Sequence, residues 1–305
     1  MIICDVLIAG GGPAGLSAAL VLARSTRSVV VLDEGKPRNG ISRSSHGYLT
    51  RDGTPPIELR ELAQLELLKY EGISFQKGIA AAIKIEHESF IAVDAEGNTY
   101  RSRKLILATG VKDSLPPIPG LQEAYGISLF PCPYCDGWEH RHMPLAVIGS
   151  ARTIFSSIKK MYTWSRDLIA FTNGEASLLS LSERRELQLR AIRVEEDPIE
   201  RIQCNNGTLE AVILQNGQSF PRSGGFVAFP CEHPASHLLN DVGLRLDDKG
   251  LPIVNGHGET AVRGLYVIGD ARTGFSGLVG AASDGYEAGV AIDRSLADED
   301  WERCR

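Results

Sequence analysis

Three glycines between an apolar segment and a helical pattern constrain this chain more than any other feature. Residues 2–9 are predicted to form a buried strand, and Gly10, Gly12 and Gly15 follow it in the spacing G-x-G-x-x-G. Apolar residues at helical spacing then run over 16–23. Gly10 permits a tight turn, bare Gly12 lets a pyrophosphate approach, and Gly15 allows close helix–strand packing, so the order predicts a dinucleotide-binding βαβ unit.

Residues on both sides of the helix complete this unit. Pro13 and Ala14 open the helix, whose first N–H groups and partial positive charge favour an anion. Residues 29–32 are predicted as a second buried strand that ends at Asp33. We expect the carboxylates of Asp33 and Glu34 to lie at ribose hydroxyls. A glycine-rich turn without a ligand is the alternative interpretation of the three glycines alone.

The remaining pattern predicts an α/β chain with two Rossmann-like domains and parallel sheets. A second βα opening lies at 144–170, after a proline-rich segment at 116–119 that we interpret as a domain boundary. Between the two openings come an amphipathic helix at 58–70 and an antiparallel meander that starts at Ile73. A strand at 265–268 and a helix at 280–296 follow, and the charged residues 301–305 are expected to be disordered.

Composition excludes several classes of function. The 305 residues carry a net charge of −6 with no basic cluster, which argues against nucleic acid and anionic membranes as partners. No apolar run is long enough to predict a membrane-spanning helix. Six cysteines are too few for a disulfide scaffold, and residues 1–9 lack the basic lead-in of a secretory signal, so a cytoplasmic location is expected.

A second motif, Cys132-Pro133-Tyr134-Cys135-Asp136-Gly137, points to redox chemistry. Two cysteines separated by two residues at a predicted helix start can close a small disulfide ring, and the helix dipole favours a thiolate. Three alternatives compete: a glutaredoxin site, a pair of buried structural thiols, and a zinc site that adds His140 and His142. The glutaredoxin fold is small and carries its motif near the first strand, and the zinc spacing is far shorter than in a finger.

Together with the glycine turn, three further segments give the chain a family resemblance. A predicted strand closes with Ala108-Thr109-Gly110, another ends in Gly269-Asp270, and a helix begins near Leu278 and Val279. In place and order, these features and the cysteine pair resemble the low-molecular-weight thioredoxin reductases, in which FAD is bound by segments from both ends of the chain. The resemblance implies an FAD domain at 1–114 and 236–305 and an inserted redox domain at 115–235.

The resemblance also implies roles for individual residues. Cys135 would face the flavin, Cys132 would attack an external disulfide or dithiol, and Asp136 would donate or accept a proton. Asp270 would lie at the ribityl and pyrophosphate groups, and Asn39 and His46 near the flavin. The implied partner is a thioredoxin-like protein or a small-molecule dithiol or disulfide, and the implied assembly is a homodimer.

The sequence departs from that family where NADPH would bind. The second glycine turn reads Gly149-Ser150-Ala151-Arg152-Thr153-Ile154, which keeps only its first glycine, and residues 170–175 lack the expected arginines and include Glu175. The sequence therefore predicts inefficient use of NADPH, as in the branches with another electron donor and in the gliotoxin-type dithiol oxidases. An NADPH-dependent thioredoxin reductase, an oxygen-dependent small-molecule dithiol oxidase and a non-enzymatic FAD-binding redox sensor remain alternatives.

Overall fold

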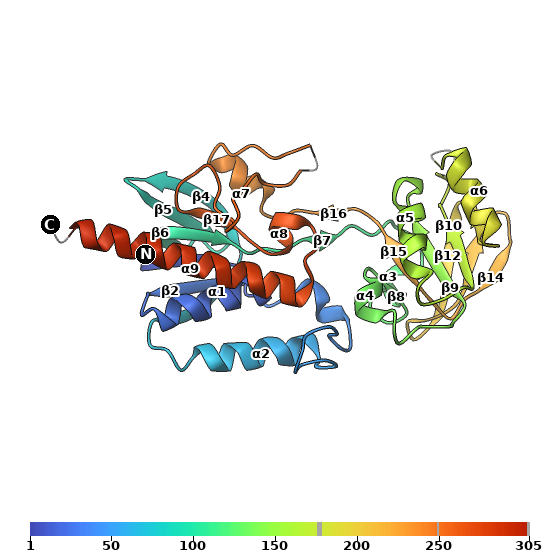
Figure 1. The fold of residues 1–305 in the computed structure, drawn as a ribbon, viewed down its shortest axis with the longest axis horizontal. Helices are drawn as coiled ribbons and strands as arrows, with labels where there is room; N and C mark the ends of the chain where they lie inside the picture. Colours follow the sequence, from blue (N-terminus) through green and yellow to red (C-terminus); the bar gives the residue numbers. More distant parts are fainter. Residues whose placement is uncertain (176–178, 249, 304–305) are drawn as a thin grey trace. The chain divides into compact units, whose positions relative to one another are not determined.

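A computed structural model describes residues 1–175, 179–248 and 250–303 of the chain. The chain folds into two compact units, which are described separately here (Figure 1). The first unit comprises Met1–Gly40, Ile57–Lys112 and Cys231–Arg305, and the second comprises Ile41–Pro56 and Asp113–Pro230. The first unit is therefore interrupted in sequence by the second.

The first unit is built on a sheet that has seven strands in the described part of the chain, in the order β3-β2-β1-β6-β5-β4, with β17 beside β6. Strands β3, β2, β1, β6 and β17 run parallel, and β4, β5 and β6 form an antiparallel meander. The elements of this unit are β1 (Ile2–Ala9), α1 (Pro13–Arg24), β2 (Val29–Asp33), η1 (Arg38–Ile41), α2 (Pro56–Leu67), β3 (Ile73–Lys77), β4 (Ala80–Glu86), β5 (Ser89–Asp94), β6 (Thr99–Leu107), α7 (Ser236–Asp241), β17 (Leu265–Val267), α8 (Asp270–Thr273) and α9 (Gly277–Arg303).

Strand β1 divides the core of this unit into two layers. Val6 and Ile8 pack in one cluster with residues of α1 and α9, and Leu7 and Ala9 pack in the other with residues of α7 and the meander. This alternation follows from the two-residue period of a strand. Helices α1 and α9 lie side by side in Figure 1 because Gly285 leaves no Cβ, which would stand 2.0 Å from the Ala14 carbonyl oxygen.

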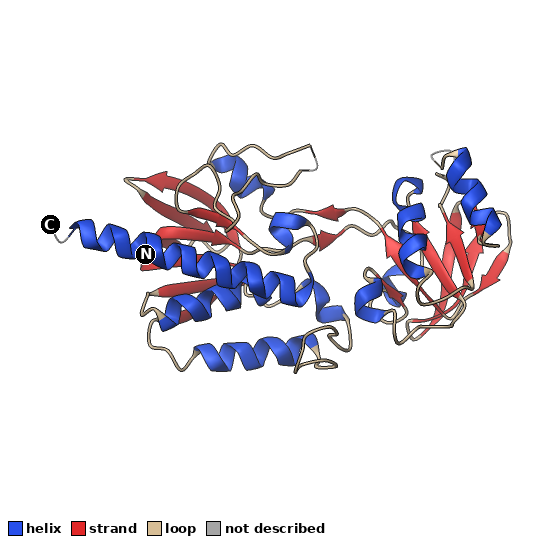
Figure 2. Cartoon of the chain, in the orientation of Figure 1, coloured by secondary structure: helices blue, strands red, loops and turns tan. Residues whose placement is uncertain are grey.

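The second unit has a parallel sheet with a helical layer on one face and an antiparallel sheet on the other (Figure 2). The parallel strands follow the order β11-β10-β9-β15-β8, and the antiparallel strands the order β12-β13-β14. The elements are α3 (Leu121–Ala124), β8 (Leu129–Phe130), α4 (Pro133–Asp136), β9 (Leu145–Gly149), α5 (Ala151–Met161), β10 (Leu168–Phe171), α6 (Leu181–Leu189), β11 (Arg193–Glu195), β12 (Ile199–Asn205), β13 (Thr208–Leu214), β14 (Ser219–Pro221) and β15 (Gly224–Ala228). The segments β7 (Lys112–Asp113) and β16 (Cys231–Glu232) pair as a further two-stranded sheet.

The predicted α/β class with two Rossmann-like parallel sheets is therefore confirmed, and the elements differ in three places. Strand β3 pairs parallel with β2, so the meander begins at β4 and not at Ile73. The segment Ile41–Pro56, expected in the FAD domain, belongs to the second unit, where Ile41 packs against Gly126. Helix α2 exposes Leu65, and Leu68 directly after the helix is exposed too, because leucines three residues apart drift around a helix of 3.6 residues per turn.

The expectation of a disordered tail is wrong for residues 301–303. Helix α9 continues to Arg303, and residues 304 and 305 lie outside the described part of the chain. Ion pairs hold its last turns against the first unit: Arg27, between α1 and β2, pairs with Asp300, and Arg103 and Lys104 of β6 pair with Glu299. No helix in the described ranges has the length and apolarity required to cross a membrane.

Candidate active site

The predicted glycine turn joins β1 to α1 in the first unit. Gly10 has a φ of +113°, and a Cβ there would stand 2.2 Å from the Ala108 carbonyl oxygen. A Cβ at Gly15 would stand 2.0 Å from the Gly10 carbonyl oxygen, whereas a Cβ at Gly12 would meet nothing within 4 Å. Gly10 and Gly15 are thus required by the fold, and Gly12 faces open space.

The start of α1 offers an anion site. Gly12 is the N-cap residue with a φ of −82° and a ψ of −175°, no side chain caps the helix, and Pro13 occupies its first turn. Ala14 is buried behind this turn. N–H groups in the first turn of a helix have no intrahelical acceptor, so an uncapped start favours a phosphate ligand.

Asp33 lies at the end of β2, beside the turn. Its Oδ2 accepts from the Gly11 N–H at 2.6 Å, and its Oδ1 accepts from the Gly35 N–H at 2.8 Å and from Arg60 Nη2. The Arg60 Nε also donates to the Gly11 carbonyl oxygen at 3.3 Å. A carboxylate oxygen accepts about two hydrogen bonds, so Oδ2 retains room for one ribose hydroxyl. Sequence reasoning missed Arg60, because nothing in the pattern of α2 shows which of its charges meets β2.

The end of β6 carries a second indication of a ligand. Ala108 donates its N–H to the Ala9 carbonyl oxygen at 2.8 Å, and Gly110 adopts a φ of +64°. Between them, the buried Thr109 Oγ1 has no hydrogen-bond partner among the described residues. Because buried hydroxyls are normally satisfied, this atom points to a polar ligand.

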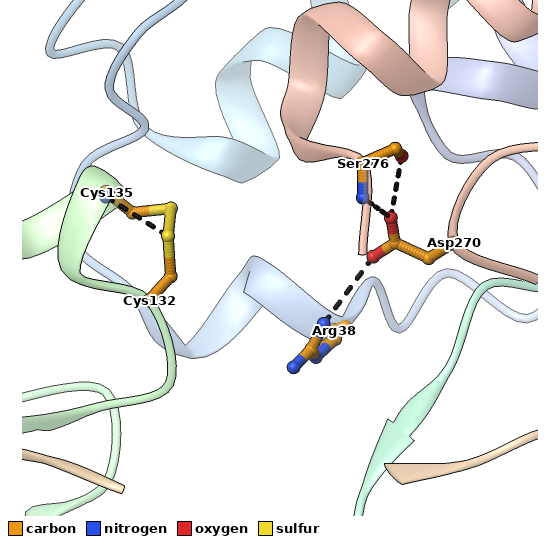
Figure 3. Close-up of a disulfide and its surroundings, with 5 residues drawn as sticks. All are labelled: Arg38, Cys132, Cys135, Asp270 and Ser276. Atoms are coloured by element: carbon orange, nitrogen blue, oxygen red, sulfur yellow. Dashed lines mark hydrogen bonds and ion pairs between the residues drawn. A yellow bond between two sulfur atoms is a disulfide. The ribbon is translucent and has the colours of Figure 1, made fainter. Parts of the chain in front are cut away.

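Asp270 follows β17, and the structure gives it partners within the first unit (Figure 3). Its Oδ1 accepts from the backbone N–H and the Oγ of Ser276, each at 2.8 Å, and its Oδ2 lies 3.5 Å from Arg38 Nη1. Gly269 has a φ of +65° and donates its N–H to Asp284 Oδ2 at 3.2 Å. Arg38, Ser276 and Asp284 carried no signal in the sequence, because their partners lie far away along the chain.

The remaining cofactor candidates have less defined surroundings. Glu34 is 42% exposed and lies 3.5 Å from Lys36, and Asn39 falls within η1. Leu278 and Val279 lie in the first turn of α9, with Val279 exposed. The open face at Gly12, the uncapped helix, the acceptor site on Asp33 and the unsatisfied Thr109 hydroxyl together fit a dinucleotide with its pyrophosphate at α1.

The cysteine pair forms a disulfide in the second unit (Figure 3). The Cα atoms of Cys132 and Cys135 are 5.4 Å apart, and the Cys132 Sγ accepts from the Cys135 N–H at 3.2 Å. Cys132 is 4% exposed and Cys135 is half-buried. Helix α4 spans only Pro133–Asp136, so this single N–H, and not a long helix dipole, is the group placed to stabilise a Cys132 thiolate.

Asp136 follows the disulfide directly. The pKa of its carboxyl is raised to about 7, chiefly by burial and then by the negative charge of Glu139, while His46 opposes the shift. An acid that titrates near neutral pH can both give and take a proton under physiological conditions.

The zinc alternative for the cysteine motif finds no support in the described residues. They contain no group of three or more His, Cys, Asp or Glu side chains that could hold a metal ion.

Two described side chains of the second glycine turn, between β9 and α5, contact the rest of the second unit. Ile154 is fully buried among the residues that α5 packs against the sheet, and Thr153 Oγ1 donates to the Ala228 carbonyl oxygen at 3.0 Å. After β10, Asn173 Oδ1 accepts from the Ile199 N–H at 2.8 Å. The expected effects of the Ala151 and Arg152 side chains lie outside the part of the structure that is described.

Residues 4–285 match the model of the pyridine nucleotide-disulphide oxidoreductase family. The chain belongs to this family. A probable thioredoxin reductase from Arthroderma benhamiae is 34% identical over 97% of this chain and 81% of its own length. The thioredoxin reductase tcpT from Claviceps purpurea is 31% identical over 97% of this chain and 95% of its own length.

A solved structure of similar sequence is the putative thioredoxin reductase TrxB from Bacillus anthracis. It shares 34% identity and a TM-score of 0.93, over 97% of this chain and 99% of that protein. The chain is therefore a flavin-dependent disulfide oxidoreductase that is similar to thioredoxin reductases.

Proposed function

We propose that this enzyme binds FAD and exchanges electrons between the flavin and an external dithiol or disulfide through Cys132 and Cys135, without efficient use of NADPH. The observation that carries the proposal is the Cys132–Cys135 disulfide directly followed by Asp136, whose partly buried carboxyl has a pKa of about 7. A disulfide with an adjacent acid of this kind supports thiol exchange near neutral pH.

We assign FAD to the dinucleotide cradle of the first unit. The N–H groups at the start of α1 would hold the pyrophosphate, Asp33 one ribose hydroxyl, and Thr109 a polar atom near the end of β6. FAD supplies reversible two-electron transfer when bound. Asp270 follows β17 at the same edge of the sheet, and hydrogen bonds from Ser276 hold its carboxylate in place.

The proposed sulfur chemistry takes place at the disulfide. A thiolate of the external dithiol bonds to Cys132 Sγ, the Cys132–Cys135 bond breaks, and its electron pair stays on Cys135 as a thiolate. The second external thiol then displaces Cys132, which leaves the external molecule oxidised and the enzyme pair reduced. Asp136 accepts the proton of the attacking thiol, and the reverse direction uses the same steps with Asp136 as the donor.

Two features of the second unit support inefficient use of NADPH. Ile154 fills the position where a glycine would let helix and strand approach, and Thr153 bonds across to the end of β15. Residues 170–175 contain no arginine that could contact a 2′-phosphate, so two charge-assisted contacts of about 1.5–3 kcal/mol each are expected to be lost. Their loss corresponds to roughly two to four orders of magnitude in affinity.

We also propose that the enzyme is a homodimer that acts on a thioredoxin-like protein or a small-molecule dithiol. The exposed Leu62 and Leu65 of α2, with the exposed Leu68 directly after it, support a second copy as a partner of that face. Light scattering coupled to gel filtration tests this point, and a monomer that persists at high protein concentration would contradict it.

Anaerobic stopped-flow reduction tests the electron donor. The holoenzyme is mixed in turn with dithiothreitol, NADPH, NADH and a reduced ferredoxin while flavin absorbance is followed. Prompt bleaching by the dithiol and slow bleaching by NADPH support the proposal. Bleaching by micromolar NADPH at tens per second would instead identify an NADPH-dependent thioredoxin reductase.

A further inference from the structure

A closed loop of the second unit holds His46 beside residues 132–142, the redox segment that carries the disulfide. Within the segment Ile41–Pro56, the Ser45 N–H donates to the Thr54 carbonyl oxygen at 2.8 Å, and the Gly53 N–H donates to the Ser45 carbonyl oxygen at 2.8 Å. These backbone bonds fix both ends of the loop. The His46 side chain is 22% exposed, so it is held against the protein rather than extended into solvent.

Both ring nitrogens of His46 face carboxylates. Nδ1 lies 3.4 Å from Asp52 Oδ2, and Nε2 lies 3.7 Å from Glu139 Oε1. Asp52 belongs to the same loop and Glu139 to the redox segment, so the ring bridges the two. An imidazole between two acceptors can take up a proton at one nitrogen and release a proton from the other.

The outer end of this chain of groups reaches solvent. The side chain of Asp52 is 67% exposed. Its other oxygen accepts from the Gly47 N–H at 2.8 Å, and this hydrogen bond, followed by that of His46, lowers the pKa of Asp52. Asp52 therefore remains a carboxylate near neutral pH, where it can receive a proton from His46 and pass it to water.

At the inner end of the chain, the charges of Glu139 and His46 act on the Asp136 carboxyl. Glu139 follows Asp136 by one helical turn's spacing, and its charge raises the pKa of the partly buried Asp136 carboxyl, whereas His46 lowers it. In the described structure, these are the two charged groups that act on Asp136 from the redox segment and from the loop. His140 contacts Asp136 only at the backbone, where Nδ1 lies 2.9 Å from the carbonyl oxygen.

We propose that His46 is a positioning residue of the dithiol/disulfide reaction, which with Glu139 relays protons between Asp136 and solvent at Asp52. This inference rests on the proposed function of the cysteine pair. When an external thiol gives its proton to Asp136, the proton leaves through Glu139 and enters the imidazole at Nε2. The imidazole releases another proton from Nδ1 to Asp52, and Asp136 is again a carboxylate for the second thiol. In the opposite direction, the same groups supply the protons that the product thiols retain.

The direct test measures the pH dependence of disulfide reduction in His46→Gln and Glu139→Gln. The FAD-loaded proteins are mixed anaerobically with dithiothreitol from about pH 5 to about pH 9. Each rate is divided by the wild-type rate at the same pH, because the ionisation of dithiothreitol affects both rates equally. His142→Gln is the matched control, because His142 is an exposed histidine of the redox segment.

The two variants are expected to shift the pH profile in opposite directions. His46→Gln removes the group that lowers the Asp136 pKa, so its inflection moves to higher pH, and Glu139→Gln moves it to lower pH. Both lose the relay and slow by about tenfold or more. If His46 and Glu139 had a purely structural role, both variants would be slower without opposite shifts of their pH profiles, and the inference would fail. Profiles of both variants that match that of His142→Gln would also overturn it.

A rescue experiment provides a second readout. In His46→Gly, free imidazole can occupy the space of the missing ring, and we expect the rate to rise with imidazole concentration while wild type does not respond. No rescue in a variant that retains FAD would contradict the relay. If wild type itself is not reduced by any dithiol, the proposed function fails, whereas normal wild-type reduction with unaffected His46 variants makes this inference alone fail.

Discussion

Gly12 and Gly15 lie three residues apart in one turn, yet alanine at the two positions should have opposite consequences. At Gly12, a Cβ meets nothing within 4 Å, and the φ of −82° is ordinary for alanine. At Gly15, a Cβ would stand 2.0 Å from the Gly10 carbonyl oxygen. We therefore predict that Gly12→Ala folds normally but binds FAD weakly, and that Gly15→Ala is damaged in its fold.

The expected magnitudes follow from these surroundings. Gly12→Ala gains about 0.4–1 kcal/mol from the stiffer unfolded chain. It loses a similar amount, roughly 0.5–1 kcal/mol, because alanine is a poorer N-cap than glycine. The apoprotein should therefore change by less than about 1 kcal/mol. Gly15→Ala must push a helix away from a strand, and overpacking of this kind costs about 1–3 kcal/mol or more.

Thermal unfolding of both apoproteins and titration with FAD by fluorescence separate the two effects. FAD at about a hundred times its dissociation constant stabilises a protein by about 2.7 kcal/mol. Wild type should show such a rise in unfolding temperature, and Gly12→Ala should not. Gly12→Asp should abolish FAD retention, because it adds a charge of the same sign as the pyrophosphate. If Gly12→Ala binds FAD as wild type does, the pyrophosphate does not approach this turn.

Three further predictions concern the disulfide and the charged groups. The family resemblance implies that Cys135 faces the flavin, so the free Cys135 thiolate of Cys132→Ser is expected to give a long-wavelength charge-transfer band, and turnover should cease. Full turnover by this variant would refute the assignment. The pKa of Asp136 is raised to about 7 in the folded protein. The folded chain therefore retains a proton that the unfolded chain releases from roughly pH 4 upward, and the free energy of unfolding falls as the pH rises from about 4 to about 7. Denaturant unfolding of Asp136→Asn should lack that fall, and an identical pH profile would contradict the raised pKa. Glu299→Gln should cost about 3–5 kcal/mol in the free energy of unfolding, because it leaves the 4%-exposed side chain of Lys104 without its carboxylate; a change below about 1 kcal/mol would show that the pair is solvated.

The local patterns of the sequence were sufficient to predict the glycine turn and the disulfide. Gly10, Gly12 and Gly15 lie within one βαβ unit, and the structure contains both the tight turn and the close helix–strand contact that they predict. Cys132 and Cys135 need only their spacing to form the ring that the structure contains. Each feature is specified by residues close together along the chain, which is why sequence alone predicts it.

Features that depend on tertiary contacts could not be predicted in this way. Arg60 neutralises Asp33 from a different element, and the pattern of its helix does not specify that contact. His46 was expected near the flavin from the family resemblance, and that role stays a prediction, whereas its contacts with Asp52 and Glu139 depend on how the segment Ile41–Pro56 folds onto the second unit. The tail was predicted from composition, which carries no information about the arginines that hold α9.

Anaerobic reduction of the FAD-loaded enzyme with and without the cysteine pair tests the central claim most directly. Dithionite titration should show that wild type takes up one more electron pair than the Cys132→Ser/Cys135→Ser variant, because the disulfide is reduced in addition to the flavin. Dithiothreitol should bleach the flavin of wild type promptly and leave that of the double variant oxidised. Equal electron uptake by the two proteins, or bleaching of both by dithiothreitol at the same rate, would contradict a path of electrons through Cys132 and Cys135.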